Sequence, residues 1–231
     1  MSTRGIYGFQ IDGELKITCS PHDSYPEGTG QVLLDAVRDL RMECGDDGLA
    51  ATIRALRCVP PDFRIQDSDI RRANSLLPPG QLRADRLPIG GAATIQDLFP
   101  AFSGRIKDAI NFGIVPDCLS FAADGLFCEW GYVVDLDAMI FEVYVGFLEE
   151  RHSRGRFAAL DRAQDQYAPI AGLVAWPIDS IPEDWDHIAH VADTILTSQA
   201  FADLDDVSAH EKLIARRLIR EFPEHIARTH I

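Results

Sequence analysis

The fold of this chain is decided by residues 1–30, which read MSTRGIYGFQIDGELKITCSPHDSYPEGTG. Residues 5–11 are apolar and rich in strand-forming side chains. Asp12-Gly13 is a strong turn signal, and residues 15–19 return with strand character. The chain is therefore predicted to open with a β-hairpin.

The rest of the chain alternates between helical and strand patterns. Apolar spacing predicts helices over residues 30–45, 49–58, 68–76, 94–112 (interrupted by Pro100 and Gly104), 184–199 and 208–222. Residues 126–147 predict a second hairpin, and residues 172–176 predict one more buried strand. We expect a single α+β domain, a layered sandwich with a central antiparallel sheet, in which residues 60–112 form a helical insertion or lid.

Composition excludes several classes of partner. The chain has 231 residues, of which 46% are hydrophobic, enough to build a substantial core. Its formal charge of −14 disfavours binding to nucleic acid or to an anionic membrane surface. It has neither a secretion signal at residues 1–20 nor an apolar run of about 20 residues that could span a bilayer. We expect a cytoplasmic protein without nucleic-acid or membrane partners, and its oligomeric state stays open.

No cofactor or metal is expected. The five cysteines contain no close pair, so we expect them to be mostly reduced and buried. Asp135 and Asp137 share one face of a strand and could bind a metal, but their stretch is more typical of a hairpin turn with solvated acids. Four arginines could bind a phosphate, but among so many acids a solvated loop is favoured: Arg151, Arg154, Arg156 and Arg162.

The amino terminus offers a catalytic hypothesis. A small residue, Ser2, follows the initiator Met, so removal of Met1 would place its hydroxyl beside a free α-amine with a pKa near ~8, able to act as its base. Asp23 would orient that amine, and Arg4 would hold a substrate carboxylate or neutralise an oxyanion. The alternative is that Ser2 has no role, because serine is among the commonest second residues in proteins.

A polar cluster follows the first hairpin. His22, Ser24 and Tyr25 flank Asp23 at the end of the second predicted strand and could contact a substrate. Exposed amides at residues 28–30 would favour an anionic group there. The alternative is a plain turn, because Asp, Ser, Pro and Gly are all turn formers. The two interpretations are compatible.

Two stretches carry a resemblance. TRGIYGF at residues 3–9 and DSYPEGTG at residues 23–30 resemble a widespread group of uncharacterised bacterial, phage and fungal proteins. Residues 129–147 and 173–184 are also similar to that group. The opening is distantly similar to amino-terminal nucleophile amidohydrolases of the conjugated bile acid and penicillin acylase type. That resemblance implies their fold, with Ser2 in place of their nucleophilic Cys and Asp23 at their Asp position.

Two functions are expected from these features. The first is hydrolysis of an amide or acyl bond in a small molecule, with Ser2 attacking and Arg4 and Tyr25 positioning the substrate. The second is a non-catalytic protein, phage-borne in one version, that binds a ligand or a partner through the cleft near Asp23. A weaker third option is an acidic interaction module that uses its exposed helices.

Overall fold

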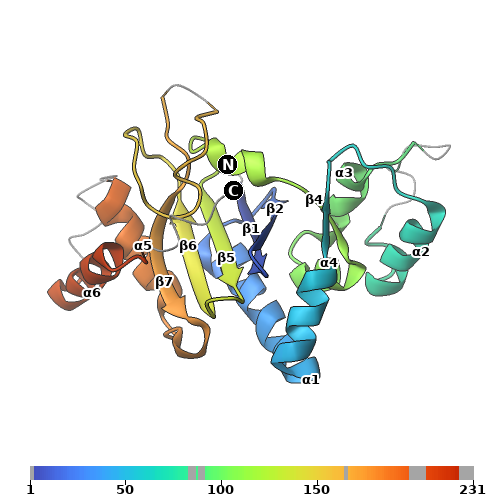
Figure 1. Cartoon of the computed structure of the whole chain (residues 1–231), viewed down its shortest axis with the longest axis horizontal. Coiled ribbons are helices and arrows are strands. Elements are labelled where there is room, and N and C mark those ends of the chain that lie inside the picture. Colours follow the sequence, from blue (N-terminus) through green and yellow to red (C-terminus); the bar gives the residue numbers. More distant parts are fainter. Residues whose placement is uncertain (1–2, 83–86, 88–91, 164–165, 198–206, 224–231) are drawn as a thin grey trace.

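A five-stranded sheet organises the computed structural model, which describes residues 3–82, 87, 92–163, 166–197 and 207–223. Its strands are β1 (Gly5–Ile11), β2 (Glu14–Ser20), β5 (Trp130–Asp135), β6 (Ile140–Val145) and β7 (Ala171–Pro177). Their spatial order is β2-β1-β5-β6-β7, which places β1 in the interior of the sheet (Figure 1). Both predicted hairpins are confirmed, as β1–β2 and β5–β6.

The α+β class is confirmed, but the expectation of an antiparallel sheet is wrong. β1 and β5 pair in parallel, with Gly5 opposite Trp130 and Gln10 opposite Asp135. The other pairs of the sheet are antiparallel, so the sheet is mixed. The turn residues of a hairpin determine how its own two strands pair, but not how the hairpin pairs with other strands. The long connection between the two hairpins returns the chain to the free edge of β1 in the same direction.

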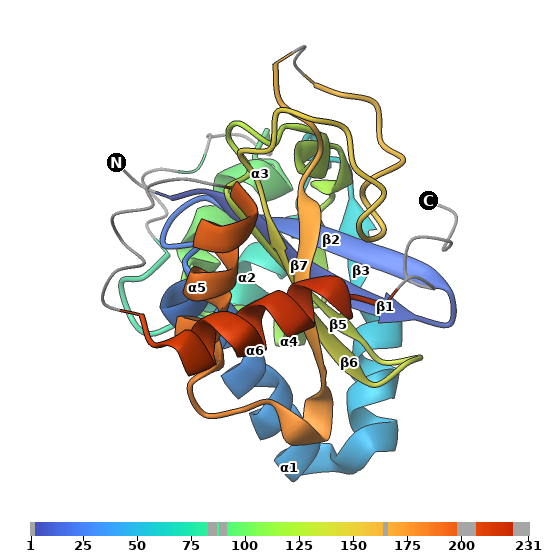
Figure 2. The same cartoon turned by 90° about the vertical axis from the view of Figure 1, so that its left-hand side faces the viewer.

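The α-helices that the structure describes bury their apolar side chains in one core cluster, on one face of this sheet. They are α1 (Gln31–Ala55), α2 (Asp67–Leu76), α3 (Ile95–Leu98), α4 (Ile106–Phe112), α5 (Trp185–Thr197) and α6 (Ala209–Arg220). The described residues also form four short helical turns: η1 (Pro26–Gly30), η3 (Phe99–Phe102), η4 (Leu119–Ala123) and η5 (Ile178–Ser180). Figures 1 and 2 show α5 and α6 beside β7, and Figure 1 shows α2, α3 and α4 together at the opposite end of the molecule.

The two faces of the sheet bury different cores. Tyr7 and Phe9 of β1 point to the face covered by α1, α5 and the helices of residues 60–112. Ile6, on the other face, packs with Phe157 from the irregular segment after β6 and with Phe222, which lies just after α6. Because successive strand residues alternate between faces and both faces are covered, every residue of β1 is buried.

The region 60–112, called the helical lobe from here on, contains α2, α3, η3 and α4. Two short strands bracket it, β3 (Arg57–Val59) and β4 (Ile114–Pro116), which pair in parallel and so hold its entry and exit together. Buried side chains of the lobe belong to the same core cluster as those of β1 and α1. The lobe therefore packs directly against the body of the protein.

Candidate functional site

The loop after β2 is held in one conformation by three hydroxyl groups. Ser24 Oγ donates to the Ser20 carbonyl at 3.2 Å, and Thr29 Oγ1 donates to the Asp23 carbonyl at 2.9 Å. The hydroxyls of Ser20 and Thr29 lie 2.6 Å apart. Asp23 itself has a left-handed backbone, with φ of 54°, which Asp tolerates better than most residues. The polar cluster is thus a turn, as one interpretation predicted, and a well-determined one.

Gly28 lets η1 pack tightly against the loop that carries Asp23. A Cβ at this position would lie 2.4 Å from the Asp23 carbonyl oxygen and 2.9 Å from its carboxylate oxygen Oδ1. Both distances are far below van der Waals contact, so no other residue fits without moving Asp23. The close packing of Gly28 in η1 against Asp23 therefore fixes the position of the Asp23 side chain.

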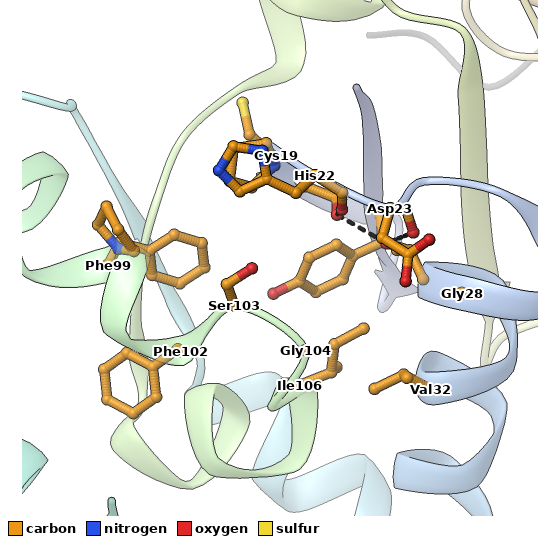
Figure 3. Close-up of a pocket in the computed structure, with 15 residues that line it drawn as sticks. Cys19, His22, Asp23, Gly28, Val32, Phe99, Phe102, Ser103, Gly104 and Ile106 are labelled. Atoms are coloured by element: carbon orange, nitrogen blue, oxygen red, sulfur yellow. Dashed lines mark hydrogen bonds between the residues drawn. The ribbon is translucent and has the colours of Figure 1, made fainter. Parts of the chain in front are cut away.

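A cavity of about 160 Å³ lies between this loop and the helical lobe (Figure 3). We call it the loop–lobe cavity. On one side it is lined by residues of β1, β2, the loop, η1 and α1: Tyr7, Cys19, Ser20, Pro21, His22, Asp23, Gly28, Thr29 and Val32. On the other side it is lined by residues of the lobe: Phe99, Pro100, Phe102, Ser103, Gly104 and Ile106. The cavity therefore joins the predicted polar cluster to the predicted insertion.

Tyr7 is the polar group that sequence reasoning missed. Its side chain is 5% exposed, and its hydroxyl has no hydrogen-bond partner among the residues that the structure describes. Burial raises the pKa of the phenol well above its ordinary value, so it stays neutral. The sequence predicted only that residues 5–11, which include Tyr7, form a strand, and nothing in it placed Tyr7 near residues 99–106.

Asp23 and His22, two of the predicted site residues, both line the cavity. The carboxylate of Asp23 forms no ion pair with any described residue. No lysine or arginine occurs among the described lining residues of the cavity. Asp23 is therefore an acid of the lining without an ion-pair partner in the part of the chain that the structure describes.

The predicted anion site at residues 28–30 is wrong. The amides of Gly28 and Gly30 donate to the Tyr25 carbonyl, and that of Thr29 donates to the Asp23 carbonyl at 2.9 Å. These donors are consumed by the tight turn that precedes α1, so none points outward to bind a phosphate or carboxylate.

The remaining predicted site residues lie outside the cavity lining. The Arg4 guanidinium lies over the Phe127 ring, 4.8 Å from its centroid. Tyr25 is 40% exposed, and its ring packs on His190 with centroids 6.3 Å apart. Ser24 is fully buried and donates its amide to the Thr3 carbonyl at 3.3 Å.

Ser2 lies outside the described residues. Thr3, which follows it, is 3% exposed and holds the start of β1 against the loop through the bond from Ser24. The hydroxyl of Tyr132 donates to the Ser24 carbonyl at 2.8 Å, so the contact is anchored in β5 as well. The structure thus brings Thr3 beside the residue that follows Asp23.

Two cysteines differ from the prediction that the cysteines are mostly reduced. Cys19 and Cys118, 99 residues apart in sequence, form a disulfide. The amide of Cys118 donates to the Ile17 carbonyl of β2, which brings the two segments together. Spacing along the chain could not reveal a pair created by this tertiary contact. Disulfides are rare in the cytoplasm, so the bond weighs against a cytoplasmic location.

The acids of the second hairpin have structural roles. Asp137 accepts hydrogen bonds from the amides of Asp12 and Gly13 at 2.8 and 2.9 Å, which ties the two hairpin turns together. Asp135 binds Arg156 at 2.9 Å, so this arginine lies in the interior and not in a solvated loop. Within the described ranges, no group of three or more acids, histidines or cysteines could hold a metal ion.

No family model, curated protein or solved structure matches this chain. None of the helices in the described part of the chain is both long enough and apolar enough to cross a membrane.

Proposed function

We propose that this protein binds a small organic molecule in the loop–lobe cavity. The observation that carries the proposal is Tyr7. Its side chain lines the cavity and its hydroxyl makes no hydrogen bond to a described residue, so a polar ligand atom in the cavity would supply a partner. Asp23 and His22 at the rim and Phe99 and Phe102 opposite them give the cavity a polar and an apolar side.

The size of the cavity limits the ligand. A cavity of about 160 Å³ is close to the ~150 Å³ of an engineered protein cavity that binds benzene. The ligand, or the part of it that enters, is therefore of the size of one aromatic ring with one small substituent.

Amide-detected NMR with a set of single-ring fragments tests this proposal. Fragments that bind should shift amide signals of residues 20–29 and of residues 99–106 together, because the two segments face each other across the cavity. The variant Ser103→Phe should abolish these shifts by filling the cavity from the lobe. Its matched control is Ser75→Phe, an exposed position on α2 that does not line the cavity. Shifts that survive Ser103→Phe would contradict the proposal.

A second function, amide hydrolysis by an amino-terminal nucleophile, is favoured by the position of Thr3. The burial of Thr3 and its bond from Ser24 place the start of β1 in the sheet interior, next to the loop that carries Asp23. An amino-terminal nucleophile fold needs its reactive residue at such a position. In this candidate Ser2 attacks, its α-amine is the base, Asp23 orients the amine, and Arg4 and Tyr25 position the substrate.

Mass spectrometry of the purified protein and a chromogenic amide assay test this second function. The active protein should begin at Ser2, Ser2→Ala should abolish hydrolysis of p-nitroanilide amides, and Ser2→Cys should retain it because a thiol is also a nucleophile. Full retention of Met1 in hydrolytically active protein would exclude the mechanism.

A further inference from the structure

We propose that the ligand of the loop–lobe cavity is a compact organic cation: a protonated amine attached to an apolar, ring-sized body. This inference rests on the proposed binding function and specifies its ligand class. Three features of the cavity support it: the carboxylate of Asp23, the loop amides of residues 28–30 that are already hydrogen-bonded, and the side chains of the apolar wall.

The charge at the rim is negative. The Asp23 carboxylate lines the cavity and has no cationic partner among the described residues, and the lining residues that the structure describes include no lysine or arginine. The other side chains of the described lining that can titrate are those of His22 and Tyr7. A cation can therefore offer Asp23 the partner that the described chain does not supply, and a charge-assisted hydrogen bond is about twice as strong as a neutral one.

Binding of an anion has no comparable support. Amide groups at the start of a helix are the usual anion site, but the amides of Gly28, Thr29 and Gly30 all donate to carbonyls of the loop. Among the described lining residues, an anionic ligand would meet the Asp23 carboxylate with no guanidinium or ammonium group to balance it. Charge repulsion would then oppose its entry.

The opposite wall accommodates the rest of such a ligand. Phe102 and Ile106 are 2% and 3% exposed, and Phe99 and Val32 complete an apolar surface. Aromatic ring faces attract cations as well as apolar groups. The Tyr7 hydroxyl is neutral, so it can accept a hydrogen bond from an ammonium group. The cavity thus pairs one acid and one neutral acceptor with an apolar wall.

Three probes of nearly equal shape test the inference: benzylamine, benzyl alcohol and benzoate. Their affinities for the full chain are measured by amide-detected NMR titration at pH 7. Benzylamine should bind at least about tenfold more tightly than benzyl alcohol, and benzoate should bind more weakly than either. Signals of residues 20–29 and 99–106 should report the binding.

The variant Asp23→Asn separates charge from shape. Asn tolerates the left-handed backbone of this position, so the loop should keep its fold. We expect benzylamine affinity to fall about tenfold and benzyl alcohol affinity to stay within about twofold. The matched control is Asp62→Asn, an exposed acid of the helical lobe that lies outside the cavity lining and changes the net charge equally.

The outcomes distinguish the two proposals. Equal binding of the amine and the alcohol, preference for benzoate, or an unchanged benzylamine affinity in Asp23→Asn would overturn the cation inference while leaving a ligand-binding cavity. Failure of all three probes to shift the cavity residues would overturn the binding function itself, and the inference with it.

Discussion

The guanidinium of Arg156 lies inside the protein, with its residue 2% exposed, and is surrounded by polar partners from three strands. It binds both carboxylate oxygens of Glu142, the Asp135 carboxylate at 2.9 Å and the Gln10 side-chain carbonyl at 2.8 Å. Tyr144 donates its hydroxyl to Glu142 at 2.5 Å. Since β1, β5 and β6 each contribute a partner, this one side chain ties the segment after β6 to the interior of the sheet.

We expect Arg156→Met to destabilise the fold by about 3–5 kcal/mol, because it leaves two buried carboxylates beside each other without a counter-charge. Urea unfolding followed by circular dichroism measures the loss. The double variant Arg156→Met/Glu142→Leu should recover part of it, because it also removes the fully buried acid.

Arg38→Met is the control for that experiment. Arg38 pairs with Asp35 on the surface of α1, with half of its side chain exposed, and such pairs contribute little. Its stability should stay within about 0.5 kcal/mol of the unchanged chain. If Arg156→Met lost no more unfolding free energy than Arg38→Met, the buried network would not contribute measurably to stability.

The Cys19–Cys118 disulfide links the end of β2 to the segment between β4 and η4, at the border of the loop–lobe cavity. A cross-link over so long a loop restricts the unfolded chain strongly. We expect the double variant Cys19→Ser/Cys118→Ser to be about 2–4 kcal/mol less stable in urea than the unchanged protein. Cys44→Ser, at an exposed free cysteine, should not change stability measurably.

Thiol counting checks the bond directly. The unfolded, unreduced protein should present three thiols, from Cys44, Cys58 and Cys128. In the folded protein only Cys44 should react rapidly with iodoacetamide, because burial raises the pKa of Cys58 to about 12 and Cys128 is enclosed. Five reactive thiols in the unfolded, unreduced chain would show that the disulfide does not form.

Local sequence patterns predicted individual helices and strands better than they predicted which strands pair with each other. The turn at Asp12-Gly13 and the alternation around it specify a hairpin by short-range geometry, and the structure contains it. The parallel pairing of β1 with β5 depends on more than a hundred intervening residues, so no local signal encodes it. The two short strands that bracket the helical lobe were missed for the same reason, because each has only three residues.

The candidate site was predictable in part. Asp23 and His22 stood out because turn-forming polar residues followed a strand, and both line the cavity. Ser24 looked like a ligand contact, but its hydroxyl holds the turn. Tyr7 was predicted only as part of the first strand, because the lobe residues that face it are brought near it by the folded chain. Sequence therefore identified the loop, and the fold determined which of its groups face the cavity.

The protein as a whole is strongly acidic, with a formal charge of −14, so buried carboxylates should influence how its stability depends on pH. Asp193 on α5 is such a group. Its oxygen Oδ1 is buried without a hydrogen-bond partner in the described structure. Burial raises the pKa of Asp193 from 3.8 to about 6, against a smaller lowering effect of the nearby His190.

The raised pKa of Asp193 determines how stability changes with pH. Because the folded-state pKa lies above the unfolded value, the folded protein binds more protons between about pH 4 and pH 6. The stability linked to Asp193 is therefore fully present below pH 3.8 and is lost as the pH rises through about 6. At neutral pH the ionised carboxylate should cost the fold about 2–3 kcal/mol.

Asp193→Asn should therefore stabilise the protein at pH 7.5 by about 2 kcal/mol, and the gain should shrink toward zero near pH 4. Urea midpoints measured from pH 4 to 8 give this difference, and the carboxyl ¹³C shift of Asp193 gives its titration directly. Asp161→Asn, at an exposed carboxyl, serves as the control and should follow the unchanged protein at every pH. A stability gain of constant size across the whole pH range would mean that Asn improves packing at this position and that the buried charge of Asp193 is not what limits stability.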